Sequence, residues 1–127
     1  MTSQPSWFQT TCLLLIDIQT DFWTGNASIQ AAFPEFPAQV GAILSTCRGA
    51  GIDVCHVLER ANARDSAWHS FWAEMNAGGC TDSSGEAEVW AAPEQSERKF
   101  FKHAYDAIGV DCGLESYLKQ ACAAARD

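Results

Sequence analysis

Three short runs of the chain have the residue pattern of buried β-strands. Residues 12–16 (CLLLI) are apolar without a break, so they neither alternate like a solvent-facing strand nor recur at helical spacing. Residues 52–58 (IDVCHVL) are rich in β-branched and apolar side chains, and residues 98–105 (RKFFKHAY) form a third strand-like segment. These runs predict strands of a parallel sheet that is covered on both faces.

Helical spacing appears between and after these runs. After Pro37, apolar residues recur at helical intervals up to Cys47, and two glycines then end the pattern, which predicts a crossover helix. Similar stripes predict a short helix over residues 64–75 and a further helix over 114–122. Residues 20–39, which contain glycine and prolines, are expected to form a long irregular connection.

The order strand, helix, strand predicts a right-handed βαβ unit with parallel strands, and therefore an α/β fold. A chain of 127 residues fits a single domain, residues 1–127. Asp17 comes directly after the first predicted strand. In an open α/β sheet, ligands bind at the carboxyl ends of the strands, so Asp17 is a candidate site residue.

Charge and composition exclude several classes of function. Eight basic and sixteen acidic side chains give a net charge of −8, which repels phosphate backbones and anionic lipids, so we expect neither nucleic-acid nor membrane binding. No stretch approaches the roughly 18 apolar residues of a membrane span, and the amino terminus lacks the pattern of an export signal, which predicts a cytoplasmic protein. The six cysteines form no C-x-x-C pair, and most are expected to be packed free thiols.

Two motifs resemble those of a known family. Residues 16–22 (IDIQTDF) and residues 102–119 (KHAYDAIGVDCGLESYLK) resemble, in order and separation, motifs of the isochorismatase-like cysteine hydrolases, which include nicotinamidases and N-carbamoylsarcosine amidases. The resemblance extends over residues 11–122. It implies a three-layer, Rossmann-like fold with sheet order 3-2-1-4-5-6, of which this chain would contain the first three strands, a truncated domain.

The resemblance also implies a catalytic site. The family uses an aspartate, a lysine and a cysteine, and the first two map onto Asp17, as general base, and Lys102. The cysteine belongs on a turn after a fourth strand, and this chain ends before that point, so we expect no activity from the chain alone. Cys112 and Cys122 follow the lysine, but neither stands at a strand-to-helix turn that would activate a thiol. Without the motifs, Asp17 would be read as a turn residue and Lys102 as an exposed loop residue.

Other residues are candidates for supporting roles. Gln19 and Asp21 are expected to organise the loop after the first strand. Asp65 and His69 stand four residues apart without a second nearby histidine, a poor metal site, so we expect neither metal nor other cofactor. Aromatic residues that could line an apolar substrate pocket, or else belong to the core or an interface, include Phe22, Trp23, Trp68 and Trp72.

Two functional hypotheses follow. In the first, the chain is the amino-terminal part of a hydrolase that cleaves an amide or related C–N bond in a small-molecule substrate once the missing half is supplied. In the second, it is a catalytically dead interaction module. The truncated sheet would expose the edge of residues 12–16, through which the chain would pair with itself or with an intact homologue.

Overall fold

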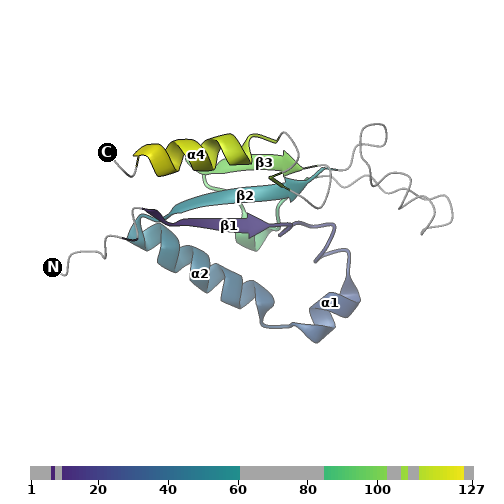
Figure 1. Ribbon diagram of the computed structural model, residues 1–127. Coiled ribbons are helices and arrows are strands. Elements are labelled where there is room, and N and C mark those ends of the chain that lie inside the picture. Colours follow the sequence, from purple (N-terminus) through teal and green to yellow (C-terminus); the bar gives the residue numbers. More distant parts are fainter. Residues whose placement is uncertain (1–6, 8–9, 61–84, 103–106, 109–111, 125–127) are drawn as a thin grey trace.

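The protein is built on a parallel sheet of three strands (Figure 1). The computed structural model describes residues 7, 10–60, 85–102, 107–108 and 112–124. The strands lie in the spatial order β1 (Cys12–Ile16), β2 (Asp53–Glu59) and β3 (Arg98–Lys102). All three predicted strands and the predicted α/β fold are therefore confirmed. The first has its predicted bounds, the second is shifted by one residue, and residues 103–105 of the third lie outside the described residues.

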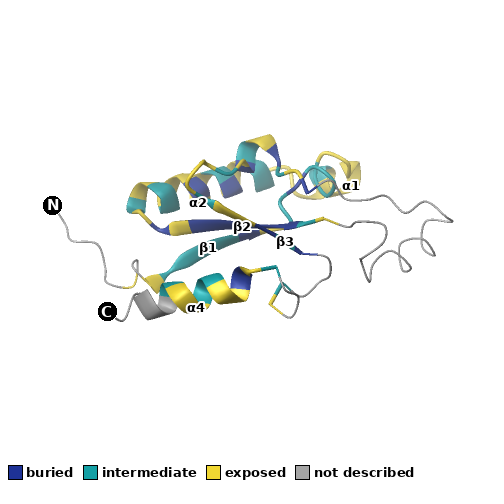
Figure 2. Ribbon diagram, turned by 90° about the horizontal axis from the view of Figure 1, so that it is seen from above, coloured by how far each residue is buried: buried dark blue, intermediate teal, exposed yellow. Residues whose placement is uncertain are grey.

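Helices cover both faces of this sheet, α2 on one side and α4 on the other (Figure 2). The described helical elements are α1 (Ala27–Ala32), α2 (Phe36–Ala50), the short 3₁₀ helix η2 (Val89–Ala91) and α4 (Leu114–Ala124). None of them is long and apolar enough to cross a membrane. The helix predicted over residues 64–75 lies outside the described residues.

The crossover helix α2 begins and ends where its sequence favours it. Pro37 occupies the first turn, where its missing N–H costs no hydrogen bond. Gly51 follows the last turn in the left-handed conformation, with φ 76°, and its N–H is donated to the carbonyl of Arg48. The N–H of Ile52 is donated to the carbonyl of Cys47 over 2.9 Å, which completes the cap.

Helix α1 was not predicted, and the irregular connection expected over residues 20–39 is wrong in this part. The side chain of Asn26 accepts a hydrogen bond from the N–H of Ile29 over 3.1 Å and caps the first turn. Helix α1 ends at Ala32, with Phe33 as its C-cap directly before Pro34, and its six residues are too few for periodicity to reveal.

The core is divided by the sheet into two clusters, because alternate strand residues face opposite sides. On the α2 face, the buried members are Leu15, Val40, Leu44, Val54 and Ala91. On the α4 face, they are Cys55, Val57, Phe100 and Leu114. Five consecutive residues of the central strand β2 are buried, whereas the edge strand β1 has only Leu15 buried and leaves 48% of Ile16 exposed.

Candidate active site at the carboxyl edge of the sheet

Asp17 turns sharply away from the end of β1. Its N–H still continues the sheet, donating to the carbonyl of Val57 over 2.9 Å. Its backbone then adopts the left-handed conformation, with φ 60°, the only such non-glycine residue in the described part of the chain. This conformation costs most L-residues free energy but is tolerated by aspartate, and residues held this way are frequent at functional sites.

The carboxylate of Asp17 forms an ion pair with Lys102, the last residue of β3. Lys102 Nζ lies 3.2 Å from Asp17 Oδ2. The lysine side chain is only 2% exposed, whereas that of the aspartate is 34% exposed. The structure thus brings together the two residues that the sequence motifs paired, although they are 85 positions apart in the chain. Their catalytic roles remain a prediction.

The second carboxylate oxygen of Asp17 is a buried acceptor without a donor. Oδ1 has no hydrogen-bond partner among the described residues, although it is shielded from solvent. Buried polar atoms are almost always satisfied, because an unmade hydrogen bond in a dry site costs about 1–3 kcal/mol. An acceptor left open beside an ammonium group has the arrangement that a general base needs for an incoming proton.

None of the described cysteines donates to this oxygen. Cys12 and Cys55 lie against each other, with their sulfur atoms 3.5 Å apart. The thiol of Cys112 donates a hydrogen bond to the carbonyl of Ala107 over 3.2 Å. Burial, followed by the hydrogen bond and charge of Cys55, raises the pKa of Cys12 to about 12. Cys12 is therefore a protonated, poorly nucleophilic thiol at neutral pH.

Gln19 fastens the loop after β1 to the end of β2. Its side-chain Nε2 donates a hydrogen bond to the carbonyl of Glu59 over 2.9 Å, and its Oε1 accepts one from the N–H of Glu59 over 2.8 Å. Nε2 also lies 3.1 Å from Oδ2 of Asp21, and the residue is fully buried. The predicted organising role of Gln19 is confirmed, and the contact also fixes the backbone of Glu59.

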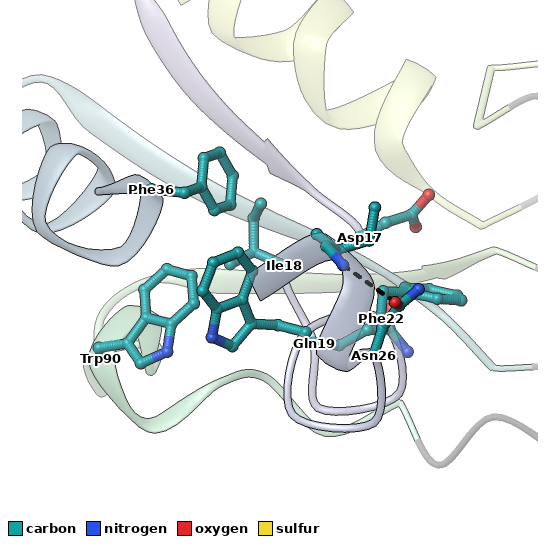
Figure 3. Close-up of a pocket in the computed structure, with 9 residues that line it drawn as sticks. Asp17, Ile18, Gln19, Phe22, Asn26, Phe36 and Trp90 are labelled. Atoms are coloured by element: carbon teal, nitrogen blue, oxygen red, sulfur yellow. Dashed lines mark hydrogen bonds between the residues drawn. The ribbon is translucent and has the colours of Figure 1, made fainter. Parts of the chain in front are cut away.

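An apolar cavity of about 360 Å³ opens next to the turn, a volume suited to a small ligand (Figure 3). The ring of Trp23 lies 5.6 Å from that of Phe36 and 5.9 Å from that of Trp90. Phe36 and Trp90 pack against the α2-face cluster, whereas the carboxylate of Asp17 points away from both rings in Figure 3. The lining residues are Asp17, Ile18, Gln19, Phe22, Trp23, Asn26, Ile29, Phe36 and Trp90.

The structure describes only two of the four residues that were predicted to line a pocket. Phe22 and Trp23 both line this cavity, whereas Trp68 and Trp72 lie outside the described residues. Phe36 and Trp90 were not predicted, since nothing in their local sequence distinguishes them from core residues. In the described ranges, no three His, Cys, Asp or Glu side chains gather in a group that could hold a metal ion.

Comparison with known protein families assigns this chain to one of them. The model of the isochorismatase domain family matches residues 11–124. No curated protein matches the chain. Similar solved structures include N-carbamoylsarcosine amidase from Thermoplasma acidophilum, with 22% sequence identity and a TM-score of 0.66. The alignment covers 87% of this chain and 61% of the amidase chain.

Two further structures show the same fold. A cysteine hydrolase from Pseudomonas syringae pv. phaseolicola has 17% identity and a TM-score of 0.66, with coverage of 91% of this chain and 56% of its own. An isochorismatase from Pseudomonas putida KT2440 has 16% identity and a TM-score of 0.64, and the alignment covers 94% of this chain and 55% of the isochorismatase chain. The chain thus spans less than two thirds of the length of these structures.

Proposed function

Since the chain belongs to the isochorismatase family, we propose that Asp17 and Lys102 form part of a hydrolase site that cleaves an amide or related C–N bond in a small molecule. The family membership supports hydrolysis, and the likeness to an amidase supports a C–N bond. A thiol attacks the carbonyl carbon, Asp17 takes the thiol proton, and the same proton then passes to the departing nitrogen. Water releases the acyl group from sulfur in a second step.

The observation that carries this proposal is the open oxygen of Asp17. Oδ2 is engaged by Lys102 over 3.2 Å, while Oδ1 is buried and has no donor within the described ranges. The ammonium of Lys102 offsets the negative charge of the carboxylate and favours a thiolate nearby. One oxygen is thus anchored and the other is ready to accept a proton.

We expect the nucleophilic thiol to come from outside the described residues. The described cysteines are Cys12, Cys47, Cys55 and Cys112, and none of them bonds to Asp17 Oδ1. We further propose that neither Cys80 nor Cys122, whose side chains are not described, serves as the nucleophile. The chain alone would then be inactive, and activity would appear when a thiol is supplied.

The test is chemical rescue. The purified chain is incubated with a panel of primary amides, with and without mercaptoethanol, and ammonia release is measured against the free thiol. We expect release that depends on the thiol and that falls at least about 100-fold in Asp17→Asn, because a general base contributes on that scale. Asparagine tolerates the left-handed conformation, so this variant keeps the turn.

Each other outcome has a defined meaning. Release without added thiol that iodoacetamide blocks would show that the nucleophile lies within the chain. Equal release by wild type and Asp17→Asn would refute the role of the acid. No release above the free-thiol background would reject the hydrolase site.

A second candidate function is an interaction module, and the outer edge of β1 favours it. Within the described part of the sheet, β1 pairs with β2 alone, and Ile16 at its end is 48% exposed. An unpaired apolar edge is a template for another strand. In this function the chain joins a second copy or an intact homologue, and inert thiols together with a stable oligomer would support it.

A further inference from the structure

Glu59 occupies the position between the two residues of the ion pair. It is the last residue of β2, the middle strand, while Asp17 follows β1 and Lys102 ends β3. Adjacent strands are about 4.8 Å apart, so the lysine side chain must reach across the end of β2 to meet Asp17. The register sets Glu59 directly opposite Lys102. Because Val57, two residues earlier, packs in the α4-face cluster, alternation places the Glu59 side chain on that face.

The backbone of Glu59 is held rigidly. Both its N–H and its carbonyl are bonded to the buried side chain of Gln19, over 2.8 and 2.9 Å. Two hydrogen bonds to one planar amide fix the position and orientation of the Glu59 backbone, from which its side chain projects. A residue mounted in this way can hold a charge at a defined point of the site.

The carboxyl group of Glu59 interacts electrostatically with the ion pair. Burial is the largest cause that raises its pKa, and the charge of Asp17 raises it further. Lys102 acts in the opposite direction, and Asp21 adds to the effect of Asp17. The Glu59 carboxyl group thus interacts with two other carboxyl groups, those of Asp17 and Asp21, and with the ammonium group of Lys102.

The guanidinium group of Arg60, the residue after Glu59, is directed to the opposite face. The guanidinium of Arg60 lies 3.8 Å from the centre of the Phe101 ring. Phe101 precedes Lys102 in β3, so its side chain faces away from that of the lysine.

We infer that Glu59 is a specificity-determining residue, which makes the site select substrates that are neutral or cationic around the reacting group and reject those with a carboxylate there. The inference rests on the proposed hydrolase function and names its substrate class. A carboxylate beside a bound anion repels it, and a neutral or positively charged group escapes this repulsion. The N–H groups of an amide or amidine can also be donated to the surrounding carboxylates.

Three probes of nearly equal shape test the inference: benzamidine as the cation, benzamide as the neutral form and benzoate as the anion. Their affinities for the full chain are measured by ligand-observed NMR titration. We expect benzamidine and benzamide to bind at least about tenfold more tightly than benzoate, an effect of about 1.4 kcal/mol. In Glu59→Gln the ratio of benzamidine to benzoate affinity should fall about tenfold, whereas Glu59→Asp, which keeps the charge, should retain most of it.

Glu35→Gln is the matched control, because Glu35 is exposed before α2 and the substitution removes the same charge. It should leave the ratio unchanged. An unchanged ratio in Glu59→Gln, or wild-type preference for benzoate, would overturn the inference, as would the absence of binding by all three probes. The thiol-rescue assay fails or succeeds independently, so loss of Asp17-dependent ammonia release with the selectivity intact would reject the proposed function alone.

Discussion

Lys102 buries an ammonium group at a position where an apolar side chain would avoid the cost of desolvation. Its side chain is 2% exposed, and its partner Asp17 keeps contact with water at 34% exposure. Removing charges from water costs several kcal/mol per ion, which a single ion pair repays only in part. The retention of such a residue at the carboxyl edge of the sheet is explained better by a role in the site than by stability.

This argument predicts that removing both charges together, in the double variant Asp17→Asn/Lys102→Met, will not destabilise the protein. We expect its free energy of unfolding, measured in urea, to be unchanged or to rise by about 1–2 kcal/mol, because methionine fills similar volume and no unpaired charge is left behind. Lys119→Met removes a lysine that is 76% exposed and should change stability by less than about 0.5 kcal/mol. A loss of more than about 1 kcal/mol in the double variant would show that the pair is structural.

Individual site residues differ in how far sequence alone predicts them. Asp17 and Lys102 stand in motifs, so their pairing could be predicted. Glu59 and Trp90 could not, because their importance depends on which strands become neighbours and how far each chain segment turns. That arrangement depends on tertiary structure and cannot be inferred from the local sequence.

At the level of elements, a partly buried ion cluster joins α2 to the start of β3. The guanidinium of Arg48, in the last turn of α2, lies 2.7 Å from Oε1 of Glu97, just before β3. The same oxygen lies 2.9 Å from Nε2 of His56 in β2, whose side chain is buried. The Arg48 hydrogen bond, aided by the backbone N–H of Glu94 and by His56, lowers the pKa of Glu97 to about 2.

This lowered pKa predicts acid sensitivity over a defined range. Glu97 titrates near 4.5 when unfolded, so its contribution is complete above that pH and is lost as the pH falls towards 2. We expect wild type to lose about 2–3 kcal/mol more than Glu97→Gln over this range in urea denaturation. Glu94→Gln, which alters an acid that is 61% exposed, should follow the wild-type curve. Parallel losses in wild type and Glu97→Gln would contradict the assignment.

The elements themselves were largely predictable, for physical reasons. The strand over residues 12–16 was visible because a run without alternation fits few structures other than a strand in a parallel sheet. The crossover helix was bounded by a proline and a glycine at positions that require them. Helix α1 escaped prediction because a single side-chain cap at Asn26, rather than apolar periodicity, stabilises it. The short 3₁₀ helix η2 forms within a contact between distant segments.

At the scale of the whole molecule, the faces of the sheet are covered but its β1 edge is not protected. Helix α2 and helix α4 cover its two faces, and β3 and β1 are its edges in the described structure. The strand β1 is short but apolar throughout, without the charges or prolines that normally protect an edge. Similar structures continue beyond the matched part, since the chain spans only 55% to 61% of three of them.

An unprotected edge predicts association that a single charge can block. Ile16→Lys introduces an ammonium group at the exposed end of β1, where 48% of the isoleucine is already in contact with solvent. The fold should therefore survive, while addition of a strand to this edge becomes unfavourable. We expect wild type to sediment as a concentration-dependent oligomer and Ile16→Lys to sediment as a monomer with an unchanged circular dichroism spectrum.

Ile43→Lys provides the matched comparison, because Ile43 is a similarly exposed isoleucine, at 50%, on helix α2. If general surface hydrophobicity drives association, both substitutions will reduce it equally. If the edge of β1 drives it, only Ile16→Lys will. A wild-type chain that remains monomeric at all concentrations would contradict the prediction and show that this edge is satisfied within the chain itself.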